Sequence, residues 1–134
     1  MSIAEMIKDH PEVGADYNAA LGQAVKHAMY CAAICNSCAD ACSAEDGDMR
    51  ECIRKCSDAS DICQALSRVG ARRTGGNVLT IKALLETCIV ACQIAAAECA
   101  HHEHAHCRRC EQMCRECIDD CGKALASLDQ YQPI

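Results

Sequence analysis

Cysteine recurs along this chain at the spacing of an α-helix. The stretch CAAICNSCADAC places four thiols at steps of four, three and four residues. Residues three and four apart lie on one face of a helix, so these thiols form a single row. The spacing returns in three further segments, and the four rows are Cys31, Cys35, Cys38, Cys42; Cys52, Cys56, Cys63; Cys88, Cys92, Cys99; and Cys107, Cys110, Cys114, Cys117, Cys121. Each row occupies the face that a core helix ordinarily fills with leucine.

Turn-forming residues divide the chain into four helical segments. Polar and glycine residues cluster at 43–48 and 70–77, and histidines cluster at 101–106. These breaks predict helices over about 12–44, 49–69, 78–100 and 105–128. No segment alternates polar and apolar residues as a strand would. We therefore predict one all-α domain over 1–134, an antiparallel up-down-up-down four-helix bundle with a cysteine-lined core.

Free thiols are expected even though cysteine is abundant. Fifteen cysteines in 134 residues would ordinarily indicate a secreted disulfide scaffold. The opening MSIAEMIKDHPEV carries charges where a signal peptide needs an apolar run, and we find no stretch apolar for the length of a membrane span. Cysteines four apart on a helix hold their Cβ atoms about 5–6 Å apart, whereas a disulfide needs about 3.5–4.5 Å. These features favour a soluble, cytoplasmic protein with reduced thiols.

Charge and side-chain chemistry exclude several functions. The net charge is −6, with acidic and basic residues interspersed, so no basic patch is available for nucleic acid or an anionic membrane. No residues form a convincing set of nucleophile, base and orienting group. We expect neither nucleic-acid nor membrane partners, and no enzyme activity.

The thiol rows indicate a soft metal. Thiolates suit Cu(I), zinc and iron–sulfur clusters. Structural zinc needs four ligands wrapped around one ion, which a straight helical row does not supply. The spacing CxxxCxxC, as in Cys31, Cys35 and Cys38, matches iron–sulfur enzymes, but here it is part of a longer row. Cu(I) accepts two or three thiolates, and each ion offsets a buried negative charge. Multiple Cu(I) ions are favoured, with an iron–sulfur or zinc-binding thiol protein as the alternative.

Rows of CxxxC and CxxC on four helices, in an alanine-rich background, make the chain resemble the cytosolic copper storage proteins, which are cysteine-lined four-helix bundles. The resemblance covers roughly residues 13–128. It implies storage and detoxification of many Cu(I) ions by the fifteen cysteines, and assembly into a homotetramer. A copper chaperone or a small-thiol donor is expected to supply the metal. The rows are interrupted at Ala59 and Ala95, where further thiols could have stood.

Residues outside the rows extend the prediction. Running the helices antiparallel puts residues at common levels, which are His27, Cys63, Cys88, Cys121; Cys31, Ala59, Cys92, Cys117; Cys35, Cys56, Ala95, Cys114; Cys38, Cys52, Cys99, Cys110; and Cys42, Met49, His102, Cys107. Apolar residues such as Leu66 and Ile81 would close the bundle beyond His27, which is either a further metal ligand or a paired core histidine.

Copper is expected to enter at the opposite end. There Met49, His102 and His104 offer thioether and imidazole groups that bind Cu(I) without losing a proton near neutral pH. His101 and His106 are expected to face water.

Overall fold

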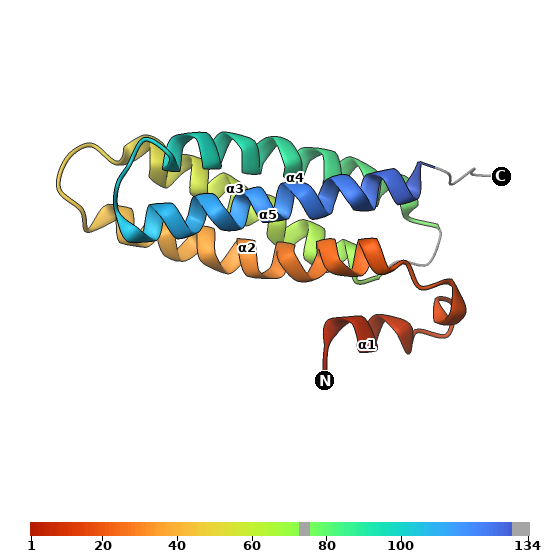
Figure 1. Ribbon diagram of the computed structural model, residues 1–134. Helices are drawn as coiled ribbons and strands as arrows, with labels where there is room; N and C mark the ends of the chain where they lie inside the picture. The colour runs from red at the N-terminus through yellow and green to blue at the C-terminus, as the bar shows by residue number, and fades with distance from the viewer. Residues whose placement is uncertain (73–75, 130–134) are drawn as a thin grey trace.

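The computed structural model describes residues 1–72 and 76–129 (Figure 1). These residues form five α-helices and one 3₁₀ turn, with no strand among them: α1 (Ile3–Lys8), the turn η1 (Gly14–Asp16), α2 (Ala19–Ser43), α3 (Arg50–Gly70), α4 (Val78–Cys99) and α5 (Ala105–Leu128). The last four helices lie side by side and are joined at alternating ends (Figure 1). The predicted all-α bundle is therefore confirmed, and its consecutive helices run in opposite directions.

The N-terminal segment differs from the prediction. The helix expected from about residue 12 begins at Ala19, where the Asn18 side chain accepts a hydrogen bond of 2.9 Å from the backbone N–H of Leu21. Such a cap ends the helix in the N-terminal direction. Gly14 adopts φ +43°, a left-handed conformation that favours glycine. The chain turns back there, so that α1 lies alongside the first half of α2 (Figure 1).

Aliphatic side chains close one end of the bundle, as predicted. We call this the sealed end, formed by the buried residues Val13, Leu66, Ile81, Leu85 and Leu128. Tyr17, Val69 and Leu125 are only partly buried, and they pack against the same core. Burying each large aliphatic side chain contributes about 1.5–3 kcal/mol. The sealed end thus supplies packing that the small residues of the remaining core cannot.

Helix α4 is more apolar than we expected. Over its 22 residues it is long and apolar enough to cross a membrane by length and composition, the one such helix in the described part of the chain. The expectation that no such stretch exists is therefore wrong. In this fold its cysteine row lies in the bundle core, while Leu79, Val90 and Ile94 remain exposed on the other side.

Candidate metal centre

All fifteen thiols are free, buried and directed into the bundle. None exposes more than 2 % of its surface, because each row is the inward face of its helix. Within the interior, neighbouring Sγ atoms approach to between 3.4 Å, for Cys63 and Cys88, and 4.0 Å, for Cys88 and Cys92. These are contacts between thiols and not disulfide bonds. The helices thus bring together sulfurs that are far apart in sequence.

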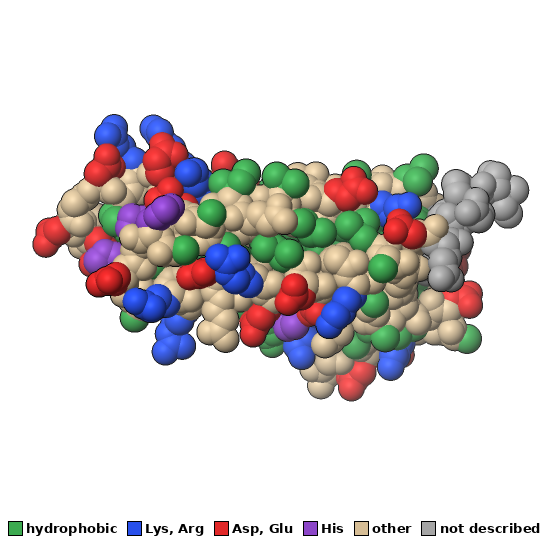
Figure 2. Space-filling model, turned by 45° about the horizontal axis from the view of Figure 1, so that its top comes forward, with side chains coloured by type: hydrophobic (Ala, Val, Ile, Leu, Met, Phe, Trp, Pro, Cys, Tyr) green, Lys and Arg blue, Asp and Glu red, His purple; other side chains and the backbone are tan. Residues whose placement is uncertain are grey.

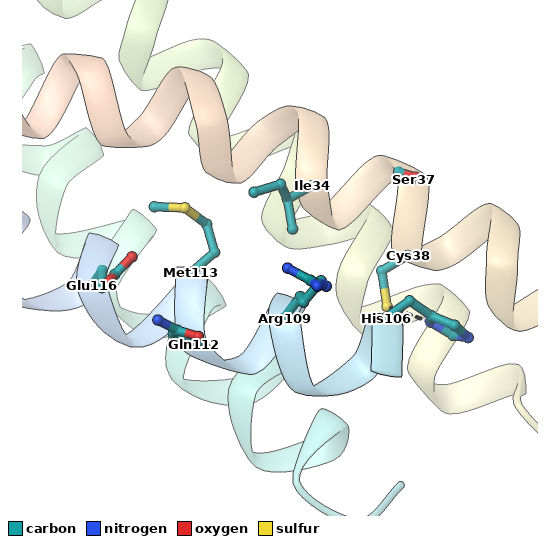
Figure 3. Close-up of a pocket in the computed structure, with 8 residues that line it drawn as sticks. All are labelled: Ile34, Ser37, Cys38, His106, Arg109, Gln112, Met113 and Glu116. Atoms are coloured by element: carbon teal, nitrogen blue, oxygen red, sulfur yellow. Dashed lines mark hydrogen bonds between the residues drawn. The ribbon is translucent and has the colours of Figure 1, made fainter. Parts of the chain in front are cut away.

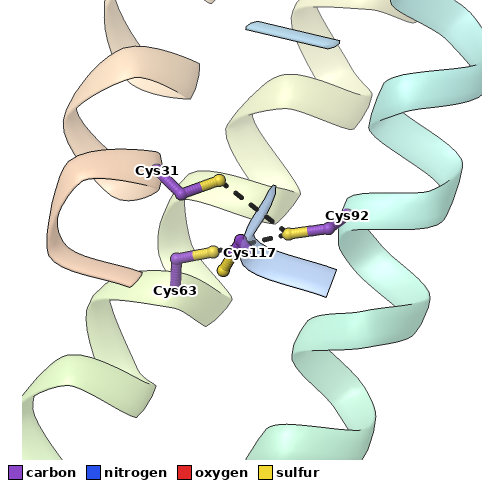
Figure 4. A group of neighbouring side chains, drawn as sticks. All are labelled: Cys31, Cys63, Cys92 and Cys117. Carbon is purple, nitrogen blue, oxygen red and sulfur yellow. Dashed lines mark hydrogen bonds between the residues drawn. The ribbon is translucent and has the colours of Figure 1, made fainter. Parts of the chain in front are cut away.

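One group draws a single thiol from each of the four helices. Cys31, Cys63, Cys92 and Cys117 have all their sulfur atoms within 4.8 Å of one another. Figure 4 shows these side chains converging, with Cys92 3.9 Å from Cys31 and 3.6 Å from Cys63. A soft cation placed among them would find several thiolates without any change in the backbone.

The remaining thiols form overlapping groups along the bundle axis. The groups are Cys31, Cys35, Cys114; Cys88, Cys117, Cys121; Cys38, Cys52, Cys56, Cys99; and Cys38, Cys42, His106, Cys107. Cys110 connects two of them, since its sulfur lies 3.6 Å from that of Cys35 and 3.8 Å from that of Cys56. Cys31, Cys38 and Cys117 each belong to two groups. The result is one continuous thiol ladder, a name we keep for the fifteen cysteines.

The predicted sets of residues at common levels along the bundle axis are only partly right. Cys31 and Cys92 lie together as expected, but their partner on α3 is Cys63, one turn away from the predicted Ala59. The Cα–Cβ bond of every helical residue tilts toward the N-terminus of its own helix. On antiparallel α2 and α3 the side chains therefore lean toward each other along the axis, and Cys63 reaches the level of Cys31. Ala59 and Ala95 are fully buried, as the interrupted rows predicted.

Hydrogen bonds between thiols and burial raise the pKa values of Cys31, Cys35, Cys42, Cys52, Cys56, Cys63, Cys88, Cys107 and Cys121, which favours their neutral form. Removal from water is the main reason that the pKa values of Cys52 and Cys107 are raised. Four thiols differ, because hydrogen bonds from neighbouring thiols lower the pKa values of Cys38, Cys92, Cys114 and Cys117. For Cys38, hydrogen bonds from Cys110 and Cys56, with a further one from His106, lower the pKa to about 6. The ladder therefore mixes thiols that favour the thiolate form with thiols that must release a proton when a cation binds.

Histidines and carboxylates gather at the other end of the bundle, which we call the open end. It comprises Met49, Glu45, Glu98, His102, His104 and His106, and Figure 2 shows the histidine and acidic side chains clustered there. His104 and His106 both contact Glu45, at 2.9 and 2.8 Å, and His102 contacts Glu98 at 2.9 Å. Met49 is buried beside the thiols. The two predicted histidines are thus at the open end, with their rings held by carboxylates.

His106 is a candidate metal ligand that was not predicted from the sequence. It was expected to face water, but its Nδ1 lies 3.3 Å from the sulfur of Cys38. Its Nε2 contacts Glu45, so the imidazole stands between a thiol and a carboxylate. The sequence spacing could have indicated this position, because His106 precedes Cys110 by four residues and therefore shares its helical face. The prediction gave more weight to His104, three residues before Cys107.

His27 pairs with a carboxylate on a neighbouring helix. Its Nδ1 contacts the carboxylate of Asp120, which joins α2 to α5. Both side chains are only partly buried. The geometry is that of a histidine paired with a carboxylate, and His27 joins none of the clustered metal-binding groups.

Comparison with known proteins agrees with this interior. The family model for the copper storage proteins matches residues 17–126. The structure of the copper storage protein Ccsp from Streptomyces lividans, loaded with 10 copper equivalents, is 34 % identical, with a TM-score of 0.86, and the alignment covers 93 % of this chain and 98 % of that one.

Two further structures of Ccsp from the same organism agree. One with five coppers, described as a cytosolic copper storage protein, is 37 % identical over 81 % of this chain and 93 % of that one, with a TM-score of 0.77. A mutant in which one histidine is replaced by alanine is 36 % identical over 82 % and 95 %, with a TM-score of 0.79. No curated protein sequence matches. On the strength of the family match and of the thiol ladder, this chain belongs to the copper storage protein family.

Proposed function

We propose that this protein stores and detoxifies Cu(I) in the cytosol by binding many ions on its thiol ladder. The observation that carries the proposal is the continuity of the ladder, in which neighbouring groups share Cys31, Cys38 and Cys117. A shared thiolate can bridge two Cu(I) ions, and each cation offsets one buried negative charge. A loaded interior with close to one ion per thiolate is then nearly neutral.

Zinc and iron–sulfur chemistry fit the ladder less well. Structural zinc sites are closed sets of four ligands, each set serving one ion. Here the groups overlap, and filling one removes ligands from the next. The interior is also long and narrow, with thiols along its whole length between the sealed and open ends. It suits a row of small monovalent ions better than one compact cluster.

The open end is proposed as the place where copper enters. Groups that can bind Cu(I) are the thioether of Met49 and the imidazoles of His102, His104 and His106. The imidazoles lie outside the first buried thiols. Cys38, Cys42 and Cys107 form one group with His106, and a lowered pKa makes Cys38 a ready acceptor within it. We assign the contact of Cys38 with His106, whose other ring nitrogen is held by Glu45, to metal capture, because the next groups inward are further thiols. His27 is not proposed as a ligand, because its ring nitrogen is engaged by Asp120.

Metal analysis of the protein loaded without oxygen tests the storage function. We expect many Cu(I) ions per chain that resist a competing chelator, and no visible colour. A triple variant replacing Cys88, Cys92 and Cys99 by alanine should lose capacity in proportion to the thiols removed, while exposed Thr87→Ala on the same helix should not. A brown protein as isolated would support an iron–sulfur cluster, and saturation by a few zinc ions would support the zinc alternative.

Self-association is proposed through the exposed side of α4. Leu79, Val90 and Ile94 are 64, 53 and 48 % exposed, which is unusual for three large apolar side chains on one helix. Figure 2 shows hydrophobic side chains in a band along the face that includes α4. The family resemblance suggests a homotetramer. Light scattering coupled to gel filtration should give a multiple of the chain mass, and replacing Val90 and Ile94 by lysine should give the single chain.

A further inference from the structure

A cleft between α2 and α5 reaches the thiol ladder from the side. Its volume is about 310 Å³, and its walls include Cys38, His106, Arg109, Gln112, Met113 and Glu116. Figure 3 shows Cys38 and His106 in contact at one end of the cleft and Met113 directed into it from α5. This is a second approach to the interior, along the flank of the bundle.

The floor of the cleft carries sulfur and nitrogen groups. Cys38, at 2 %, is the most exposed of the fifteen thiols, and thirteen of the others have no exposed surface. Met113 is buried, with 8 % of its surface exposed, and His106 Nδ1 is 3.3 Å from the Cys38 sulfur. A thiol, an imidazole and a thioether therefore line one small space. All three are ligands that Cu(I) accepts.

The rim of the cleft carries polar groups that have no partners among the described residues. Arg109, Gln112 and Glu116 make no side-chain hydrogen bond or ion pair with any residue in 1–72 or 76–129. Their neighbours on α5 are engaged, since Arg115 bonds Glu111 at 2.8 Å and Arg108 donates to the carbonyl of Glu103 at 3.4 Å. The positive Arg109 and the negative Glu116 thus face solvent at the cleft with their bonding capacity unused.

We propose that this cleft binds the Cu(I) complex of a low-molecular-weight thiol that carries a carboxylate and an ammonium group, and that copper passes from it to Cys38. Arg109 matches the carboxylate, Glu116 the ammonium and Gln112 an amide of the ligand. The volume is at the small end of ordinary ligand sites, whereas a protein donor would need roughly 800 Å² of surface on each partner. The proposal rests on the storage function proposed above.

The transfer is an exchange of ligands on copper with no change of oxidation state. The Cys38 sulfur forms a bond to Cu(I), and the bond between Cu(I) and the donor sulfur breaks. The proton of the Cys38 thiol, where present, moves to the departing donor thiolate, with His106 Nδ1 in position to relay it. The products are Cys38-bound Cu(I) and the free donor, released as a thiol where Cys38 supplied a proton and as a thiolate where it did not, so atoms and charge balance.

Loading kinetics with the Cu(I) complex of glutathione test the cleft. In the unchanged protein, we expect the initial rate to saturate as the concentration of this complex rises. Arg109→Gln should raise the half-saturating concentration about tenfold, because a hydrogen bond to a charged group is lost. Arg108→Gln is the matched control, since it removes the same charge from the adjacent residue outside the cleft, and its kinetics should not change. A second donor, the Cu(I) complex of bathocuproine disulfonate, is too large for the cleft and provides a reference rate for each protein.

A second variant tests whether the donor complex must enter the cleft. Gln112→Trp on the exposed rim should obstruct the cleft and slow loading from the glutathione complex relative to the reference donor, with the helix content checked by circular dichroism. The proposal is overturned if the unchanged protein does not saturate, if Arg109→Gln and Arg108→Gln behave alike, or if Gln112→Trp slows neither donor. An effect of these variants on a protein donor, with none on glutathione, would also overturn it. Failure of all proteins to hold Cu(I) from either donor would instead contradict the storage function.

Discussion

Gly70 shows how closely the end of α3 packs against α2. A Cβ atom at this position would lie 2.7 Å from a methyl group of Val25, which is fully buried. Overpacking of this kind costs about 1–3 kcal/mol, more than the gain of at most about 1 kcal/mol from replacing glycine in a helix. We expect Gly70→Ala to lower the free energy of unfolding by about 1 kcal/mol, as measured by denaturant titration of the metal-free protein.

Gly122 is the control for that change. It lies within α5, and a Cβ atom there would meet nothing within 4 Å. Gly122→Ala should therefore raise the free energy of unfolding by up to about 1 kcal/mol through helix propensity alone. If both alanine variants were stabilised, the contact with Val25 would not limit the packing of α3.

His106 should control the ionisation of Cys38. Its hydrogen bond is one of those that lower the pKa of Cys38 to about 6, so His106→Ala should move that pKa upward. The pH dependence of Cys38 alkylation, followed by mass spectrometry of the peptide, measures the change. His101→Ala, at an exposed position, should leave the alkylation profile where it is. Equal profiles for the two variants would remove His106 from this role.

Single residues also show which features of the site can be predicted from the sequence. The burial of every cysteine followed from periodicity, because one helical face must point inward whatever the neighbouring helices do. The partners of His27 and His106 did not follow, because they depend on Asp120, Glu45 and Cys38, which lie far away in the sequence. Local spacing says which face a histidine occupies but not which acidic group stands opposite.

At the scale of elements, the sealed end should determine stability without affecting metal capacity. Leu66 is fully buried among aliphatic side chains, and Leu66→Ala leaves a cavity there. We expect a loss of about 2–5 kcal/mol in the free energy of unfolding, with the number of Cu(I) ions per folded chain unchanged. Thermal and denaturant unfolding measure the first quantity, and metal analysis measures the second.

Leu79→Ala is the control for Leu66→Ala, because it makes the same substitution at an exposed position. At 64 % exposure, Leu79→Ala should change the stability of the single chain by no more than about 0.5 kcal/mol. A similar loss for Leu66→Ala and Leu79→Ala would mean that the sealed end does not hold the bundle together.

Helix boundaries were predicted where the sequence has strong breaks. The ends of α3, α4 and α5 lie within a residue or two of the predicted ends, because glycine and polar turns leave little choice. The start of α2 was placed too early, since the helix could have continued through residues 12–18 by propensity alone. The cap made by Asn18 and the packing of α1 on α2 determine where α2 begins, and both depend on how the chain turns back.

At the scale of the whole molecule, pH should act in opposite directions on the empty and loaded states. Burial raises the pKa of Cys107 above the ordinary thiol value of about 8.5. A raised pKa in the folded state contributes stability that is present below the ordinary value and is lost as the pH rises through the folded value. The metal-free protein should therefore lose stability in alkaline solution, as unfolding at a series of pH values would show.

Copper binding should have the reverse dependence. A thiol that binds Cu(I) releases its proton, so the apparent affinity should rise with pH. Calorimetry in buffers of different ionisation enthalpy counts the protons released. Binding without proton release would mean that the buried thiols are already ionised, contrary to the effect of burial on Cys52 and Cys107.

Because the sealed end has no metal-binding side chains, the bundle is a tube closed at one end. An ion beside Cys88 and Cys121 can leave only after passing the positions nearer to Cys38 and His106. The copper ions would then lie in the order in which they entered, with the oldest copper deepest and the most recent copper exchanged first. In a pulse of one copper isotope followed by another, the later isotope should be withdrawn before the earlier one. A cell drawing on such a store would use its newest metal and leave a long-lived residue behind.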